Sequence, residues 1–186
     1  MKNRKVKNKI PKKVNGITTI TLGDVVKSDE TVRKWMKIFA AQFRNLYKLP
    51  EFSEEGVKAL EALILKLRDL HFASDVSPFT LQFTQMAISY FGECLIKETG
   101  GEWVRYNDTD QDDLIAIKKP GDKYLFPASK TTKFINNGMA ESIFLMYYFS
   151  KHSELSFEDL EWDENGECLI NIPEGEVRIT KFPVLQ

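Results

Sequence analysis

The stretch that decides the fold is GGEWVRYN (residues 100–107), followed by an aspartate-rich turn, LIAIK (114–118) and YLFP (124–127). In the first two segments apolar and polar residues alternate, which is typical of half-buried antiparallel strands joined by a short turn. The two leading glycines favour the left-handed conformation that ends a helix, so a helix is expected before them. Residues 79–149 are therefore predicted to form a compact unit in which a helix is followed by a hairpin.

Two amphipathic helices are predicted before this unit. Ser28 is a suitable N-cap for the first, Pro50 ends it, and Ser53 begins the second. Apolar residues recur every three or four positions in both, which places them on one buried stripe. In the first helix these residues are Val32, Trp35, Met36, Phe39, Phe43, Leu46 and Tyr47. In the second they are Val57, Leu60, Leu63, Ile64, Leu67 and Leu70, with Lys58, Glu61, Lys66, Arg68 and Asp69 on the solvent side.

A third helix is predicted from Ser77 to the glycine pair. Ser77 followed by proline fits a cap and a first helical position, and apolar residues recur at helical spacing from Phe79 to Leu95. Gly92 interrupts this pattern, and a glycine inside a helix costs about 1 kcal/mol relative to alanine. We therefore expect another element to approach the helix closely there. Glu93 and Glu98 fall near the polar side of the pattern and are expected on the surface.

Two short helices and a second hairpin are predicted after the sheet. The first helix covers residues 127–137, and Gly138 breaks it. The second covers residues 142–149, with these residues inward: Ile143, Met146, Tyr147 and Phe149. Glu164-Asn165-Gly166 predicts a turn between strands at 157–162 and 168–172, and a final strand follows at 177–182. The predicted class is α+β, with N-terminal helices packed on a small, mostly antiparallel sheet.

The composition indicates one folded domain. The chain has 186 residues, of which 42% are hydrophobic and thirteen are Phe, so it can bury a large, Phe-rich core. We expect a domain at 16–186, preceded by a basic, flexible arm at 1–15. Cys94 and Cys168 fall in apolar patterns typical of reduced, buried thiols, although their spacing leaves a disulfide between them open.

The N-terminal charges resemble the start of a secretory signal, but the apolar run that should follow is missing. Residues 17–22 are short, interrupted by threonine and strand-like, so neither a signal peptide nor a membrane-spanning helix is predicted. The expected location is the cytoplasm.

Charge is unevenly distributed along the chain. Residues 1–15 hold seven of the 26 basic residues and none of the 27 acidic ones, whereas residues 152–177 hold nine carboxylates and no Lys or Arg. An acidic body repels phosphate backbones. Nucleic-acid binding is therefore expected only weakly, and only through the arm.

Part of the 79–149 unit resembles a family of small bacterial α+β domains of uncharacterised function, which includes proteins regarded as immunity factors of polymorphic toxin systems. The residues that carry the resemblance are Tyr90-Phe91-Gly92-Glu93, Gly100-Gly101, Trp103, Leu114 to Ile117 and Phe126-Pro127. The resemblance implies a binding domain rather than an enzyme, and it transfers no catalytic residue. The basic arm and the acidic C-terminal region lie outside it.

The motifs of common enzymes and metal sites are absent from the sequence. His71 and His152 are the only histidines, neither has zinc-ligand spacing, and no phosphate loop or nucleophile elbow occurs. Three aspartates at 108, 110 and 112 match the start of a calcium loop, but Asp113 replaces the required glycine and Lys119 the required glutamate. No catalytic residue, cofactor or metal is predicted.

Two functional hypotheses from different classes remain. In the first, an acidic hairpin at 154–176 binds a basic protein such as a toxin, and Phe157 and Trp162 are candidate anchors. Its predicted binding residues are Glu158, Asp159, Glu161, Trp162, Asp163 and Glu164. The same residues also fit an ordinary solvated hairpin with its aromatic side chains buried. In the second hypothesis, a pocket between the helices and the sheet binds a small molecule or a substrate.

Overall fold

The computed structural model describes residues 13–14, 17–18, 28–72, 78–108, 111–152, 167–172 and 175–180, with side chains at 28–70, 78–106 and 115–152. The helical elements are α2 (Asp29–Tyr47), α3 (Glu54–Phe72), α4 (Leu81–Thr99), α5 (Pro127–Asn137), the 3-10 turn η1 (Gly138–Glu141) and α6 (Ile143–Lys151). The strands are β1 (Lys13–Val14), β2 (Ile17–Thr18), β3 (Glu102–Asp108), β4 (Gln111–Lys119), β5 (Lys123–Leu125), β6 (Glu167–Ile172) and β7 (Gly175–Thr180).

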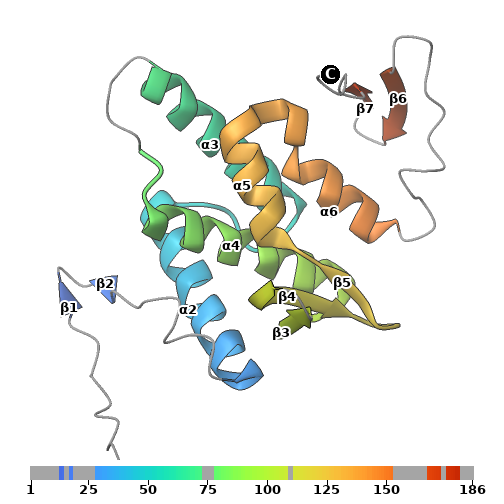
Figure 1. Ribbon diagram of the computed structural model, residues 1–186. Coiled ribbons are helices and arrows are strands. Elements are labelled where there is room, and N and C mark those ends of the chain that lie inside the picture. The colour runs from blue at the N-terminus through green and yellow to red at the C-terminus, as the bar shows by residue number, and fades with distance from the viewer. Residues whose placement is uncertain are drawn as a thin grey trace, which may run out of the picture.

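The predicted α+β class is confirmed: five helices and a three-stranded antiparallel sheet, ordered β3-β4-β5, make up the body (Figure 1). Helix α4 lies at its centre, with α2 on one side and α3, α5 and α6 on the other. Every residue of α4 from Ser89 to Leu95 is buried, which is the mark of a helix covered on all sides. The core therefore forms around α4.

Capping residues fix where the helices begin and end. The Ser28 hydroxyl accepts a hydrogen bond from the Thr31 amide at the start of α2, as predicted, and Gly100 ends α4 at φ +70°. The predicted start of α4 at Ser77 is wrong, because Thr80 is the N-cap and accepts from the Phe83 amide at 3.1 Å. Threonine offers the same capping oxygen three residues later, and sequence alone did not separate the two.

The predicted apolar stripes are largely buried, but some of their residues near helix ends are exposed. Leu46 and Leu70 are 56% and 54% exposed, since each lies in the last turn of its helix. In α6, Phe149 was expected inward and is only partly buried, whereas Phe144, for which no orientation was predicted, is buried. Helical spacing gives the direction of a side chain, and a neighbouring element must still be there to cover it.

The predicted hairpin is confirmed, and its register places one face of the sheet against the helices. Trp103 on β3 pairs with Ile117 on β4, which in turn pairs with Leu125 on β5. Asp29, at the start of α2, accepts a hydrogen bond at 2.9 Å from the backbone amide of Arg105 on β3. Helix α2 is thus tied directly to the outer strand of the sheet.

The predicted close approach at Gly92 is confirmed by Trp103. The indole is 1% exposed and lies directly on the glycine, so that a Cβ atom added at Gly92 would be 1.9 Å from Trp103 Cζ2. Beside it, Trp103 Nε1 donates a hydrogen bond to Glu93 Oε1 at 2.8 Å. A glycine is therefore required where the sheet meets α4.

Strands β6 and β7 form a two-stranded antiparallel sheet, with Glu167 opposite Thr180 and Ile172 opposite Gly175. They overlap the strands predicted at 168–172 and 177–182. The predicted turn at Glu164-Asn165-Gly166 lies outside the described residues. Residues 157–162, which were expected to form the partner strand, lie outside the described part of the chain.

We predict that Gly92→Ala destabilises the protein by about 3 kcal/mol or more, because the new methyl group must displace a fully buried indole. Urea unfolding followed by tryptophan fluorescence measures the change. Gly100→Ala is the matched control: its Cβ meets open space, so only the positive φ is penalised, at about 1–2 kcal/mol. Equal losses in the two variants would contradict the packing argument.

Candidate functional site

The six predicted partner-binding residues, Glu158, Asp159, Glu161, Trp162, Asp163 and Glu164, all lie outside the described residues. The Cys168 side chain does too, as does the tip of the aspartate-rich turn at 109–110. The described residues instead show how the polar groups of the helical body are used.

Glu61 was expected in solvent and is buried, with 9% of its surface exposed. Its Oε1 accepts hydrogen bonds from Ser142 Oγ at 2.6 Å and from the Phe144 amide at 2.9 Å. Ser142 also caps α6 by accepting from the Leu145 amide. A carboxylate on α3 therefore satisfies the free amide end of another helix, where negative charge is favourable.

Glu93 was also expected on the surface and is buried, with 8% exposed. Burial raises the pKa of its carboxyl group above the ordinary value, opposed by the hydrogen bond from Trp103 and by the charge of Lys37. The carboxylate faces the contact between α4 and the sheet, so its main role is to satisfy the indole N–H.

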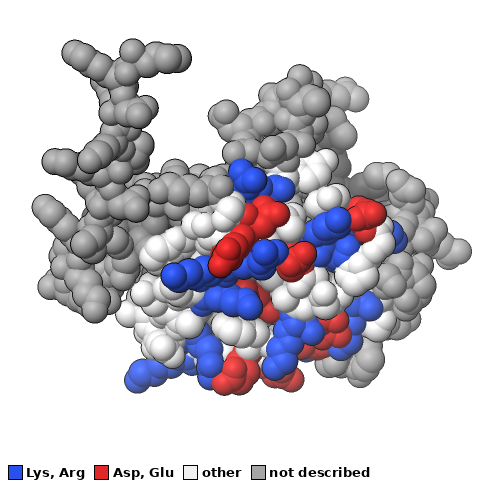
Figure 2. Space-filling model, turned by 90° about the horizontal axis from the view of Figure 1, so that it is seen from below, with Lys and Arg blue, Asp and Glu red and all other residues white. Residues whose placement is uncertain are grey.

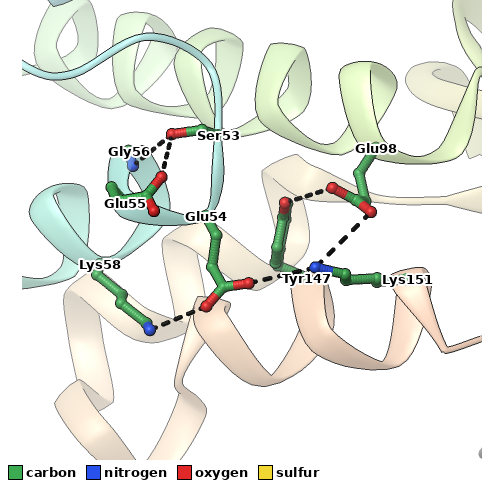
Figure 3. Close-up of polar contacts among 8 residues, drawn as sticks. All are labelled: Ser53, Glu54, Glu55, Gly56, Lys58, Glu98, Tyr147 and Lys151. Carbon is green, nitrogen blue, oxygen red and sulfur yellow. Dashed lines mark hydrogen bonds and ion pairs between the residues drawn. The ribbon is translucent and has the colours of Figure 1, made fainter. Parts of the chain in front are cut away.

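A third polar cluster joins the ends of α3, α4 and α6 (Figure 3). Lys151 Nζ lies 3.4 Å from Glu54 Oε2 and 4.0 Å from Glu98 Oε1, and Tyr147 donates to Glu98 Oε2 at 2.7 Å. Lys58 completes the chain of contacts, 2.9 Å from Glu54 Oε1. Positive and negative groups alternate along this chain of contacts. They connect the C-terminal part of α6 to the start of α3 and the end of α4.

Two pKa shifts in this cluster favour the ionised form of Glu54 and the protonated form of Tyr147. The hydrogen bond from Lys58 and the charges of both lysines hold the pKa of Glu54 below its ordinary value, although burial acts against them. Burial, helped by the neighbouring Glu98, raises the pKa of Tyr147. Tyr147 is therefore a hydrogen-bond donor rather than a base, and the cluster has the character of a structural contact.

The described core also contains the thiol of Cys94. Its side chain is fully buried in α4, and burial raises the pKa of the thiol to about 12. A thiol that keeps its proton at neutral pH is a poor nucleophile. The prediction of a buried, reduced Cys94 is confirmed, since the structure shows it as a free cysteine.

Charges are mixed on the described surface. Figure 2 shows Lys and Arg interspersed with Asp and Glu on the face seen from below, with neither sign forming a continuous patch among the described residues. Residues 28–152 hold 16 basic and 17 acidic residues, whereas residues 153–186 hold two basic and nine acidic ones. The acidic excess therefore belongs to the C-terminal region and not to the helical body.

The described residues show neither a metal-binding cluster nor a membrane-spanning helix. They contain no group of three or more His, Cys, Asp or Glu side chains placed to hold a metal ion. None of their helices combines the length and the apolar character needed to cross a bilayer.

Comparisons with known proteins add no relative: no family model, curated protein or solved structure matches this chain. The functional argument therefore rests on the residues of this chain.

Sequence reasoning missed the clusters around Glu61 and Glu54. One signal was present, because Glu54 and Lys58 lie one helical turn apart on α3, as do Tyr147 and Lys151 on α6. Such spacing indicates that polar groups share a side of one helix. It does not show that these two helices face each other.

We predict that Glu61→Leu destabilises the protein by about 2–4 kcal/mol, because it leaves the Ser142 hydroxyl and the Phe144 amide buried without an acceptor. Glu61→Gln keeps an acceptor oxygen in place and should cost about 1 kcal/mol. Thermal unfolding followed by circular dichroism measures both. If the two variants were equally stable, the capping role of Glu61 would be wrong.

We predict that Glu93 makes the protein less stable as pH rises. A raised pKa means that the folded state binds the proton more tightly than the unfolded state does. The free energy of unfolding then falls from pH values near the ordinary glutamate pKa, about 4.3, up through the raised value. Chemical denaturation across this range should show a shallower slope for Glu93→Gln than for wild type, with exposed Glu30→Gln as the control.

Proposed function

We propose that this protein is a cytoplasmic, non-enzymatic protein-interaction domain of the immunity type, which neutralises a basic toxin through its acidic C-terminal region. The residues assigned to partner binding are Glu158, Asp159, Glu161, Trp162, Asp163 and Glu164. The observation that carries the proposal is the separation of charge between a nearly neutral body at 28–152 and a strongly acidic region at 153–186.

A concentrated charge of one sign favours fast and selective association. Complementary potentials raise association rates and reject partners of like charge. Salt screens exposed charges beyond about 8 Å at physiological ionic strength, and neighbouring charges of mixed sign also cancel one another. The C-terminal region has an uncompensated field of this kind, and the described surface of the body has interspersed charges. A cationic protein is the partner that this distribution fits best.

The described polar groups of the body support a scaffold role. Glu61 caps α6, Glu93 accepts a hydrogen bond from the Trp103 indole, and Tyr147 donates a hydrogen bond to Glu98. Each of these groups contributes to packing between helices or between a helix and the sheet. Trp162 adds an aromatic residue within the acidic region, and tryptophan is enriched among the residues that dominate binding energies.

The test is a charge reversal in the acidic region. The quadruple variant Glu158→Lys, Asp159→Lys, Glu161→Lys and Asp163→Lys should lose a basic protein that co-purifies with the wild type from its native host. With the purified partner, calorimetry should show an affinity about 100-fold lower and a weaker dependence on salt.

The control must make the same change in net charge elsewhere. Glu30, Glu51, Asp69 and Asp122 are exposed residues of the body, and their replacement by Lys removes surface ion pairs worth about 1 kcal/mol or less each. It also reverses a favourable charge in the first turn of α2 and places Lys at the positive φ of Asp122, so the thermal stability of this control is measured together with its binding. This control should keep the partner. Equal affinity in both quadruple variants would refute the acidic-region proposal, since net charge rather than these residues would then be responsible.

A further inference from the structure

Helix α2 carries a row of exposed residues on the side that faces away from the core. These residues recur at intervals of three and four positions, so they share one side of the helix, and each of them is exposed. The buried residues of α2 lie on the opposite side. We call this row the basic stripe, and its residues are Lys34, Lys37, Ala41, Asn45 and Lys48.

The positive charge of the basic stripe is not neutralised by ion pairs. Residues 31–50 contain five basic residues and no acidic one. The two arginines among them are paired with carboxylates from outside the helix. Lys34, Lys37 and Lys48 make no hydrogen bond or ion pair with any described residue, and Lys37 acts on Glu93 only through its charge. The uncompensated charge is therefore arranged as a row along one helix.

The acidic C-terminal region has the complementary composition. Residues 152–177 contain nine carboxylates and no Lys or Arg, so the region has no cation of its own to neutralise them. The basic stripe extends about 21 Å from Lys34 to Lys48, which is long enough to contact several acidic residues of an adjacent chain. Opposite potentials favour this pairing, whereas the same carboxylates would repel the phosphates of a nucleic acid.

The position of α2 favours a contact between molecules. Helix α4 lies between α2 and α6 (Figure 1), and the acidic region begins directly after the end of α6. To reach the basic stripe of its own molecule, the region would have to pass around the body, whereas the stripe of a second molecule is directly accessible. Two molecules can make the contact reciprocally, which closes a twofold dimer.

We propose that the basic stripe of α2 binds the acidic C-terminal region of a second copy of this chain. In the free protein, this contact occupies the acidic residues that the proposed function assigns to a basic partner. A basic partner then competes with self-association, and its binding releases the second copy. The inference rests on the acidic region of the proposed function, but not on the identity of the partner.

Sedimentation equilibrium of the full-length protein measures the self-association. The wild type should form dimers at low salt. Raising the salt from about 0.1 M to about 1 M shortens the screening length from about 10 Å to about 3 Å, and should lower the association constant at least tenfold. The triple variant Lys34→Glu, Lys37→Glu and Lys48→Glu should be monomeric at low salt, because its stripe repels the acidic region.

The matched control is the triple variant Lys66→Glu, Lys123→Glu and Lys133→Glu. It makes the same change in net charge at exposed lysines of α3, β5 and α5, which also form no ion pair with a described residue. This control should still form dimers. Thermal unfolding of both triple variants checks that each is folded.

A charge exchange between two variants gives the sharpest test. The quadruple variant with lysines in the acidic region should be monomeric alone, as should the triple variant of the basic stripe. When the two are mixed, both reciprocal contacts again join opposite charges, so a heterodimer should form with an association constant within about tenfold of the wild type.

Four results would overturn the inference: a monomeric wild type at low salt, a stripe variant that dimerises like the wild type, a control variant that is also monomeric, or a mixture that does not associate. None of them bears on the proposed function, because the binding of a basic partner to the quadruple variant is measured separately.

Discussion

The contact of the Trp103 ring with Gly92 is the constraint on which the body of the protein depends. It brings β3 against the middle of α4, the helix around which the core is built. The indole N–H must then be satisfied within the core, and Glu93 on the adjacent helical position supplies the acceptor. Three neighbouring features, a missing side chain, a large ring and a buried carboxylate, therefore form one unit, and none of the three is understood without the other two.

A second theme is that carboxylates in this body, some of them buried, accept hydrogen bonds from backbone or side-chain donors of other elements. Glu61 reaches from α3 to the first turn of α6, and Glu98 on α4 holds the Tyr147 hydroxyl. Arg68 makes the complementary contact, donating to the carbonyl oxygens of Phe134 and Ile135 near the end of α5. Charged groups at helix ends are stabilised by the partial charges of the unpaired backbone groups there. These polar contacts thus help to fix how α3, α4, α5 and α6 are placed relative to one another.

Much of the fold could be predicted from local chemistry, because capping residues, glycines and alternation act within a few residues of the structure they specify. The structure confirms the helix start predicted from Ser28, the close approach predicted from Gly92 and the helix end predicted from Gly100. The errors have a common origin in contacts between distant segments. Glu61 and Glu93 were assigned to solvent because a helical pattern does not show where another helix end or an indole will lie. The opposite error occurred at Leu46 and Leu70, which were predicted to be buried and are exposed, because no described element covers them. The candidate binding residues at 158–164 lie outside the described chain, so their assignment rests on charge and composition alone.

The hydrogen bond from the Arg105 amide to Asp29 has a consequence for how this protein meets copies of itself. Strand β3 is an outer strand, and its unpaired backbone groups would otherwise be a template for a strand from another molecule. The carboxylate occupies the middle of that template, and the Arg33–Glu102 ion pair adds charge at its beginning. On the opposite side, β5 is only three residues long. Both borders of the sheet formed by the described strands β3, β4 and β5 are thus unsuited to edge-to-edge aggregation.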